Sequence, residues 1–403
     1  MDGRPSAAKA IVRLGLKSPH ALLLRRIETR LSITGLGALS ALGVGIEAHH
    51  RALSEIRIPF RPLGELLGNE SPHAAIPGAW IADRALLTHR KWSPATMAAL
   101  HVAREALSQT GWSADEMRDA ALVLGTSRGN AAGWLGPWPG RRPFKLMAAS
   151  NTIHSEPASA ISIEFGIQGP NHVVASGCAA GLDAVGVAMM MVKCGLASRA
   201  LAVAVDLPLV PMLLDNYAAS GLLARGLRMN PYHPDSSGFT PGEGAAAIAF
   251  EAGYHDGPDL LYYSCNSDAC DPVGIPAGGG NTISLIRSAF EAVGGCDAIS
   301  PHATGTAVQA KADPAILSAV FTDRKPTVHP LKPFLGHTIG ASGLLESVIL
   351  ARFLRDGKLP PNIAGLHAPE GFVLPTDSID AAGPVFKLSH GMGGHNALLV
   401  ISP

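Results

Sequence analysis

Residues 171 to 181 read Asn-His-Val-Val-Ala-Ser-Gly-Cys-Ala-Ala-Gly, and they give the strongest structural signal in the chain. A short apolar segment leads into the small, flexible pair Ser176-Gly177, and Cys178 opens a mostly apolar run that continues to Val192. The pattern predicts a buried strand, a tight turn and a buried helix, with the Cys178 thiol at the helix N-terminus. The helix dipole there favours a thiolate, so Cys178 is a candidate nucleophile. The alternative is a small buried cysteine that only fills space.

The composition indicates a large, compact protein with much buried surface. The chain has 403 residues, enough for one large domain or two fused halves. Only 16% of the residues are charged and 47% are hydrophobic, which favours deeply buried helices, a subunit interface, or both. Equal numbers of acidic and basic residues, 32 each, give no support for a nucleic-acid binder. No apolar run reaches about 18 residues, so we expect no transmembrane span.

The cysteines favour reduced thiols and a cytoplasmic location. Five cysteines are too few and too scattered for a disulfide framework in a chain of this length. Cys265 and Cys270 have no second Cys or His pair at zinc-ligand spacing, so we expect no metal site.

Residues 1–30 differ from the rest and are predicted to be a basic N-terminal extension. They combine several Lys and Arg with apolar positions typical of an amphipathic helix, and they lack the long apolar region and cleavage site of a secretory signal. A docking arm or a frayed tail is the simplest interpretation, and a transit peptide is the alternative.

Strands and helices alternate through the remaining chain, which predicts an α/β fold. Residues 252–280 are polar and glycine-rich and are expected to be a turn between two similar halves, 31–251 and 252–403. Strands are predicted from Leu31 and near 120–124, 200–205, 240–251, 297–300 and 397–401, and helices near 93–109, 179–192, 281–293, 312–321 and 340–355.

Two histidines lie where a strand ends or a helix begins. His302 follows an apolar strand, in the stretch Ser300-Pro-His-Ala-Thr-Gly-Thr306. His337 ends the stretch Lys332-Pro-Phe-Leu-Gly-His337 and precedes a small-residue turn and an apolar helix. A helix N-terminus disfavours imidazolium and keeps such a ring neutral. A neutral imidazole N–H can donate to a developing oxyanion.

A third glycine-rich stretch, Ser389-His-Gly-Met-Gly-Gly-His-Asn396, precedes the last predicted strand. Its glycines let backbone amides approach a substrate closely. Taken singly, each histidine or glycine turn is more often structural than catalytic. The combination of one cysteine at a helix start with two histidines in small-residue turns is the informative feature.

These motifs, in this order, resemble those of the β-ketoacyl-acyl-carrier-protein synthases (ketosynthases), condensing enzymes of the thiolase superfamily. Members have a cysteine in a small-residue turn, then His-Gly-Thr-Gly-Thr, Lys-x-x-x-Gly-His and Gly-Phe-Gly-Gly-Thr-Asn. This chain has Cys178, His302 to Thr306, Lys332 to His337, and Gly391 to Asn396 in the matching places. The resemblance covers about Leu31 to Pro403, and the pair of histidines is similar to the elongating Cys-His-His type.

The resemblance implies a thiolase fold, with two similar βα halves in a five-layered αβαβα arrangement. It also implies a decarboxylative Claisen condensation in fatty-acid or polyketide biosynthesis, in which a Cys-bound acyl chain reacts with malonyl-acyl carrier protein. No cofactor of its own is expected, because phosphopantetheine arrives on the carrier protein. The partners expected are acyl carrier protein and a second ketosynthase-like subunit, in a homodimer or a heterodimer.

The resemblance also assigns expected roles to individual residues. Cys178 accepts the acyl group, while His302 and His337 bind the malonyl thioester carbonyl and promote decarboxylation. Lys332 holds the histidine network in place, and the backbone N–H groups of Cys178 and Met392 form the oxyanion hole. The remaining expected site residues are Thr304 and Thr306 on the phosphopantetheine arm, Met392 at the acyl entrance, and Glu243 and Asn396 as structural residues near the site.

The chain departs from the family pattern at several positions. Met392 stands where the family has a gatekeeper Phe, His395 replaces a Thr, and Ala303 replaces a Gly. Ala310 stands where the family usually has Asp, and Asp313 where it usually has Glu. These departures suggest an altered acyl entrance and a changed polar network around the histidines.

Two other functions are alternatives to a catalytic ketosynthase. A thiolase needs a second cysteine in the C-terminal glycine turn, where this chain has Met392. A non-catalytic or weakly active chain-length-factor-like subunit typically lacks the nucleophile, which Cys178 argues against, while Ala310 and Met392 keep this alternative open. Carrier proteins are acidic, so Arg128, Arg141, Arg142, Lys145 or the N-terminal extension could form the docking surface, or could be ordinary solvated charges.

Overall fold

The computed structural model describes residues 29–131, 150–226, 229–272 and 274–403. The predicted extension 1–30 lies almost entirely outside this range, as do Arg141, Arg142 and Lys145. No described helix is both long and apolar enough to cross a membrane.

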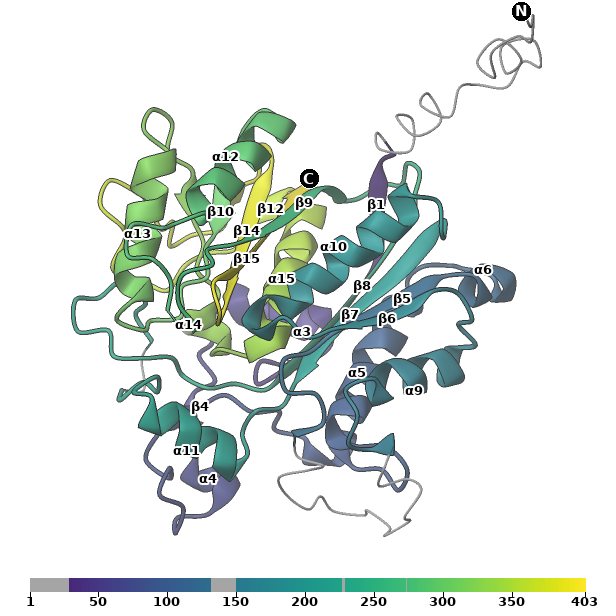
Figure 1. Ribbon diagram of the computed structural model, residues 1–403, viewed down its shortest axis with the longest axis horizontal. Helices are drawn as coiled ribbons and strands as arrows, with labels where there is room; N and C mark the ends of the chain where they lie inside the picture. Colours follow the sequence, from purple (N-terminus) through teal and green to yellow (C-terminus); the bar gives the residue numbers. More distant parts are fainter. Residues whose placement is uncertain (1–28, 132–149, 227–228, 273) are drawn as a thin grey trace, which may run out of the picture.

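One large mixed sheet runs through the molecule in the order β11-β10-β14-β15-β9-β1-β8-β7-β5-β6, with β2 on β1 (Figure 1). Its two halves are joined where β1 meets β9 through the single residue pair Ser32 and Asp259. The first half consists of β1 (Leu31–Ser40), β2 (Gly43–Val44), β5 (Ala121–Gly125), β6 (Asn171–Val174), β7 (Arg199–Asp206) and β8 (Gly244–Ala252). The second consists of β9 (Asp259–Ser267), β10 (Ala298–Ser300), β11 (Thr327–Val328), β14 (Val385–Gly391) and β15 (His395–Ser402).

Helices lie between the two half-sheets and outside each of them, which gives the five layers expected of the fold (Figure 1). The central helices α10 (Ala180–Lys193) and α15 (Ser342–Arg355) pack on each other and contact strands of both halves. On the outer faces, α5 (Pro94–Leu107) and α9 (Glu156–Phe165) cover the first half, and α12 (Thr282–Val293) and α13 (Gln309–Val320) cover the second. The predicted α/β arrangement is confirmed.

The central helices approach closely because glycine lies at their contact. A Cβ added at Gly181 would lie only 2.8 Å from the carbonyl oxygen of Gly340. The starts of α10 and α15 are therefore held side by side, and both candidate motifs that precede these helices are brought together. The largest hydrophobic cluster, with Leu182, Leu344 and Leu345 at its centre, surrounds this contact.

The prediction of a turn over 252–280 was wrong in its central part. Strand β9 lies there and pairs with β15 along most of its length. Its apolar residues Leu260 to Tyr263 were hidden by flanking turn and polar residues, so no alternating pattern was evident.

Further elements are α3 (Ile46–Ser54), α4 (Gly64–Leu67), α6 (Ala114–Arg118), α11 (Pro211–Ala219), α14 (Lys332–Leu335), β3 (Arg61–Pro62), β4 (Pro77–Gly78), β12 (Lys358–Leu359) and β13 (Ile379–Asp380).

Candidate active site

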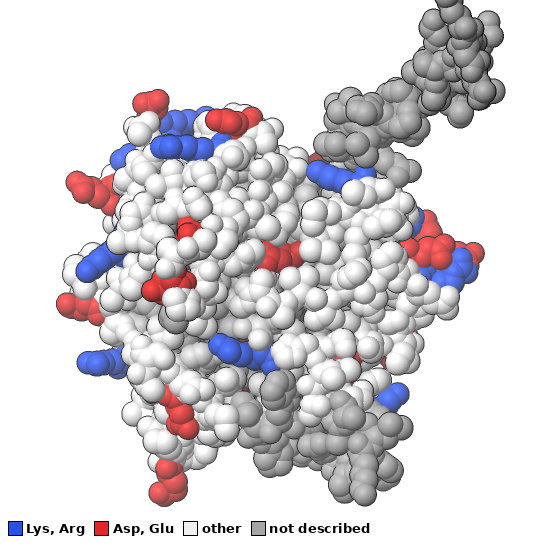
Figure 2. Space-filling model, in the orientation of Figure 1, with Lys and Arg blue, Asp and Glu red and all other residues white. Residues whose placement is uncertain are grey.

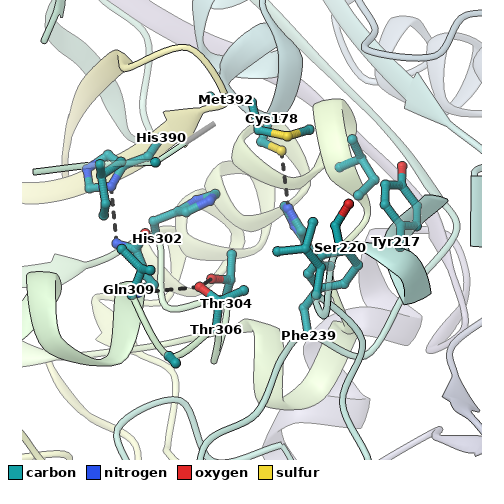
Figure 3. Close-up of a pocket in the computed structure, with 18 of the residues that line it drawn as sticks. Cys178, Tyr217, Ser220, Phe239, His302, Thr304, Thr306, Gln309, His390 and Met392 are labelled. Carbon is teal, nitrogen blue, oxygen red and sulfur yellow. Dashed lines mark hydrogen bonds between the residues drawn. The ribbon is translucent and has the colours of Figure 1, made fainter. Parts of the chain in front are cut away.

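Cys178, His302 and His337 come from distant parts of the sequence and line one cavity of about 260 Å³ (Figure 3). The Nε2 atom of His337 lies 3.3 Å from Sγ of Cys178. The ring centroids of His302 and His337 are 5.4 Å apart, in an edge-to-face arrangement. All three side chains are buried. The structure therefore brings the predicted nucleophile and both predicted histidines to one place.

The cysteine lies in a short turn between β6 and α10, as expected, but the prediction that the preceding strand is buried was wrong, because β6 is an edge strand whose residues are exposed or half-buried. Residues Gly177–Ala179 form a single 3₁₀ turn, η2, which leads directly into α10. Gly177 has φ of +63°, a value that side-chain-bearing residues rarely adopt. A Cβ at Gly177 would lie 3.7 Å from the backbone nitrogen of Met392, so the turn rests against the β14–β15 hairpin. The backbone amides of Cys178 and Met392 are thereby placed on neighbouring segments.

The expectation that the helix start favours a resting thiolate is wrong for this site. Burial raises the pKa of the Cys178 thiol to about 11, although the charges of Lys332 and Arg128 act in the opposite direction. Burial outweighs these charges because the sulfur is enclosed in a narrow, largely apolar cavity. At neutral pH the nucleophile is therefore a thiol, and the adjacent Nε2 of His337 is the base within reach of its proton.

We predict that alkylation of Cys178 by iodoacetamide becomes about tenfold faster with each pH unit until the pH reaches about 11. The reason is that only the thiolate reacts, and burial keeps its fraction small at neutral pH. Peptide mass spectrometry reads the Cys178 adduct directly, and free cysteine, with a pKa of about 8.5, serves as the reference. A rate that stops rising at or below pH 7 would contradict the thiol assignment.

His302 and His337 are both neutral. Burial lowers the pKa of His302 well below its ordinary value, and the charge of Lys332 lowers it further. Burial also lowers the pKa of His337, followed by the charges of Lys332 and Lys387. The sequence-based expectation of a neutral His337 agrees with this direction, although burial is the dominant cause. Neutral rings suit hydrogen-bond donation to a carbonyl oxygen without proton loss.

A fully buried ion cluster lies behind the histidines. The Nζ atom of Lys332 is 2.7 Å from one carboxylate oxygen of Glu346, and Nζ of Lys387 is 2.8 Å from the other. Lys387 also donates to the carbonyl oxygens of Ser300 and Pro301, at 3.3 and 3.1 Å. No hydrogen bond joins Lys332 to either cavity histidine among the described residues. Its influence on them is electrostatic, while Lys387 supports the backbone that leads into His302.

The other predicted site residues fall into two groups. Thr304, Thr306 and Met392 line the cavity, and the hydroxyl oxygens of the two threonines are 3.3 Å apart. Glu243 and Asn396 are buried outside its lining. Glu243 forms an ion pair with Arg84 and accepts the backbone N–H of Ile81, and Asn396 donates to Asn266 and Asp268.

The sequence departure at Ala303 has a measurable structural consequence. Ala303 has φ of +46°, in the left-handed region that favours glycine. Its backbone N–H donates to the carboxylate of Asp313, at 2.9 Å, which fixes the turn after His302.

We predict that Ala303→Gly raises the free energy of unfolding by about 0.5–1 kcal/mol. The change removes the strain of a positive φ in the folded state, and this gain exceeds the cost of the extra conformational entropy that glycine gives the unfolded chain. Urea unfolding measures this change. The matched control is Ala315→Gly in helix α13, which is expected to lower stability by about 1 kcal/mol. Equal losses in both variants would show that Ala303 is unstrained.

Several buried polar residues near the cavity were missed by sequence analysis. Asp183 on α10 accepts hydrogen bonds from Ser176, from Nε2 of His395 at 2.7 Å and from the hydroxyl of Tyr263 at 2.6 Å. Asp206 at the end of β7 accepts the backbone N–H groups of Ser127, Arg128 and Gly340. These two carboxylates tie the loops around Cys178 to one another. Asp183 and Asp206 both lie in apolar stretches of the sequence, which do not indicate these hydrogen bonds.

Arg128, which the sequence suggested as a docking residue, has a local partner in the structure, and a group of potential metal ligands that the sequence did not suggest lies near the cavity. The guanidinium of Arg128 lies over the ring of Tyr217, a residue that lines the cavity. Asp183, Cys265 and His395 bring potential metal-ligand atoms within 4.8 Å of one another. Within this group, Nε2 of His395 is hydrogen-bonded to the carboxylate of Asp183.

Comparison with family sequences matches this chain to the β-ketoacyl synthases in two consecutive segments. The N-terminal domain of that family matches residues 81–254, and the C-terminal domain matches residues 260–365. Together the segments span more than half of the chain.

Individual proteins similar to this chain agree with that match. A 3-oxoacyl-[acyl-carrier-protein] synthase 2 of Coxiella burnetii is 26% identical, over 93% of this chain and 99% of its own length. Nodulation protein E of Rhizobium leguminosarum bv. trifolii is also 26% identical, with the same coverage. Among solved structures, the ishigamide ketosynthase/chain length factor has a TM-score of 0.80 at 22% identity, over 93% of this chain and 99% of that one. A type II polyketide synthase ketosynthase in complex with its acyl-carrier protein gives a TM-score of 0.79, also at 22% identity and with the same coverage.

Proposed function

Because this chain belongs to the β-ketoacyl synthase family, we propose that it is a ketosynthase that condenses a Cys178-bound acyl chain with malonyl-acyl carrier protein. The observation that supports this most directly is the convergence of one thiol and two neutral imidazoles on one buried cavity. A soft nucleophile that is also a good leaving group, beside paired N–H donors, is what acyl transfer followed by decarboxylation requires.

In the first step, Sγ of Cys178 attacks the thioester carbonyl of the acyl carrier. Nε2 of His337, 3.3 Å from the sulfur, accepts the thiol proton, and the departing carrier thiol takes it away. The backbone N–H groups of Cys178 and Met392 stabilise the tetrahedral oxyanion. The products are an acyl-Cys178 thioester and a free carrier thiol.

In the second step, the malonyl thioester occupies the cavity. With Cys178 acylated, Nε2 of His337 no longer faces a thiol hydrogen and takes the tautomer that donates. N–H groups of His302 and His337 then bind the thioester carbonyl oxygen. The carbon–carboxylate bond breaks and carbon dioxide leaves. The resulting enolate carbon attacks the acyl carbonyl, the bond to sulfur breaks, and Cys178 leaves as a thiolate that takes a proton from water.

Roles for the surrounding residues follow from their positions. Thr304 and Thr306 line the cavity and hydrogen-bond the phosphopantetheine arm. Met392, which is partly exposed on the cavity rim, adjusts the acyl entrance because its side chain is flexible. Lys332 acts through its charge, and Glu243 and Asn396 are structural. No cofactor is held by the chain itself, since phosphopantetheine arrives with the carrier protein.

We further infer a dimer that forms along the edge strand β6. This strand ends the sheet and pairs only with β5 among the described strands, so its outer edge offers unpaired backbone groups. Figure 2 shows that the face over α10 is largely uncharged, and Met190 and Leu196 are exposed at the C-terminal end of that helix. The halves 31–251 and 252–403 act as one catalytic unit, and the small number of cysteines, five in 403 residues, fits a reducing cytoplasm.

A chain-length-factor-like subunit remains the second candidate. Met392 and Ala310 depart from the family pattern, and one similar solved structure pairs a ketosynthase with a chain length factor. Co-purification with a second ketosynthase-like chain, together with no condensation by this chain alone, would favour that function.

The test is direct detection of the condensation product. The purified protein is incubated with an acyl carrier protein that carries short, medium or long acyl chains and with malonyl-acyl carrier protein. We expect a β-ketoacyl carrier protein, longer by one two-carbon unit, and one carbon dioxide per product. No product with any chain, from the protein alone or with a co-purified partner, would refute the proposed function.

A further inference from the structure

A third histidine, His390, lies beside the two that the proposed function uses. It is at the end of β14, it is buried, and it lines the same cavity (Figure 3). Its ring centroid is 5.4 Å from that of His302, the same separation as between His302 and His337. His302 is thus the middle ring of three.

A chain of hydrogen bonds fixes which nitrogen of His390 carries hydrogen. The side-chain amide nitrogen of Gln309 donates to the carboxylate of Asp313, and the same nitrogen is 3.1 Å from Nδ1 of His390. A carboxylate only accepts hydrogen bonds, so the NH₂ group of Gln309 must face Asp313, and with it His390. Nδ1 of His390 is therefore an acceptor, and the hydrogen is on Nε2. Burial lowers the pKa of His390 to about 4, so the ring is neutral.

Two ring nitrogens, Nε2 of His390 and Nδ1 of His302, have no hydrogen-bond partner among the described residues. Both atoms are enclosed. Buried polar nitrogens without a partner are unfavourable, and a centroid separation of 5.4 Å is short enough for two ring nitrogens that point at each other to form a hydrogen bond. Catalytic hydrogen bonds often tighten in this way when substrate binds.

We propose that His390 is a positioning residue that donates from Nε2 to Nδ1 of His302 and so holds the hydrogen of His302 on its own Nε2. This rests on the proposed function, in which His302 donates to the malonyl thioester carbonyl. The series Asp313, Gln309, His390, His302 then transmits one orientation from a fixed carboxylate to the reacting oxygen. Without the donor, His302 divides between two tautomers, and one of them cannot donate to the substrate.

The experiment separates the decarboxylation step from acylation of Cys178. Release of carbon dioxide from malonyl-acyl carrier protein is measured for His390→Phe, which keeps a ring and removes both nitrogens. We expect turnover to fall about 10–100-fold with an unchanged KM, because in this proposal His390 acts through His302 and not by binding the substrate. His390→Gln restores an amide donor and is expected to recover most of the turnover. The control is His367→Phe, a histidine that is exposed and does not line the cavity.

A double-mutant cycle tests the hydrogen-bond series itself. Gln309→Met removes the group that fixes the tautomer of His390 and should reduce turnover in the wild-type background. The same change should have little further effect in His390→Phe, because the series is already broken. Additive losses would show that Gln309 and His390 act independently, and would overturn the proposal.

Nitrogen-15 NMR of histidine-labelled protein gives a readout that does not depend on activity. We expect His302 in the wild type as a single neutral tautomer with hydrogen on Nε2, and as a mixture in His390→Phe. A mixture in the wild type would overturn the proposal, even if condensation is observed. Unchanged decarboxylation in His390→Phe, or a raised KM with unchanged turnover, would also overturn it. Absence of all decarboxylation in the wild type would count against the proposed function instead.

Discussion

Cys178→Ala is expected to abolish formation of the β-ketoacyl product, with a loss of at least about four orders of magnitude. Cys178 is the only cysteine that lines the cavity among the described residues, and His337 is positioned to take its proton. Without the sulfur no acyl-enzyme forms, and the enolate has no acyl group to attack. Liquid chromatography with mass spectrometry of the carrier protein measures the product.

The matched control for this variant is Cys296→Ala. Cys296 is also buried, but it lies in the outer hydrophobic cluster of the second half, where its thiol donates to the carbonyl oxygen of Ala298. Condensation should survive this change, because Cys296 does not line the cavity. Decarboxylation of malonyl-acyl carrier protein should survive in Cys178→Ala, since both histidines remain. Condensation by Cys178→Ala at a rate near that of the control would exclude Cys178 as the nucleophile.

Glu346→Ala is expected to lower the free energy of unfolding by about 3–5 kcal/mol. Glu346 is fully buried between Lys332 and Lys387, which are also fully buried. Burial alone would raise the pKa of Glu346, yet the two ammonium groups hold it below its ordinary value. Removal of the carboxylate leaves two enclosed cations facing each other without a counter-ion. Urea unfolding monitored by circular dichroism measures the change.

An exposed ion pair provides the comparison for Glu346. Nζ of Lys358 lies 2.6 Å from Oδ1 of Asp380, and both side chains are solvent-exposed. Asp380→Asn should leave the free energy of unfolding nearly unchanged, because water screens the pair. Similar small changes in Glu346→Ala and Asp380→Asn would show that the buried cluster does not stabilise the fold.

The same cluster predicts that the free energy of unfolding of the wild-type protein depends on pH. Burial lowers the pKa of Lys387 to about 8, while the charge of Glu346 acts in the opposite direction. In the unfolded chain this lysine has an ordinary pKa near 10.5, so the folded state binds fewer protons between the two values. The contribution of Lys387 to stability therefore increases as the pH rises from about 8 toward 10.5.

Sequence analysis anticipated the positions of the reacting groups because each lies at a recognisable junction. Cys178 follows a strand and opens a helix, and His302 and His337 lie in small-residue turns at the ends of other elements. Such junctions meet at one edge of a layered α/β fold, so their convergence follows from topology. The alternation of strands and helices was sufficient for the fold class.

Other features depended on packing that no local pattern reveals. Glu346 and Lys387 lie within an apolar helix and an apolar strand, where their sequence context indicates only core. The pKa of Cys178 moved opposite to the helix-dipole expectation because the depth of burial is a tertiary property. The role we propose for His390 arises only from its contact with Gln309, which is 81 positions away in sequence. Strand β9 was hidden between turn residues and was identified only by its pairing with β15.

The most direct test of the account is peptide mass spectrometry of the wild-type protein after incubation with an acyl carrier protein thioester. The account predicts an acyl group on the peptide that contains Cys178, and on no peptide with Cys194, Cys265 or Cys270, which are exposed. Subsequent addition of malonyl-acyl carrier protein should remove that group as product forms. Product formation with no acyl group ever detected on Cys178, or with the acyl group on another cysteine, would contradict the account.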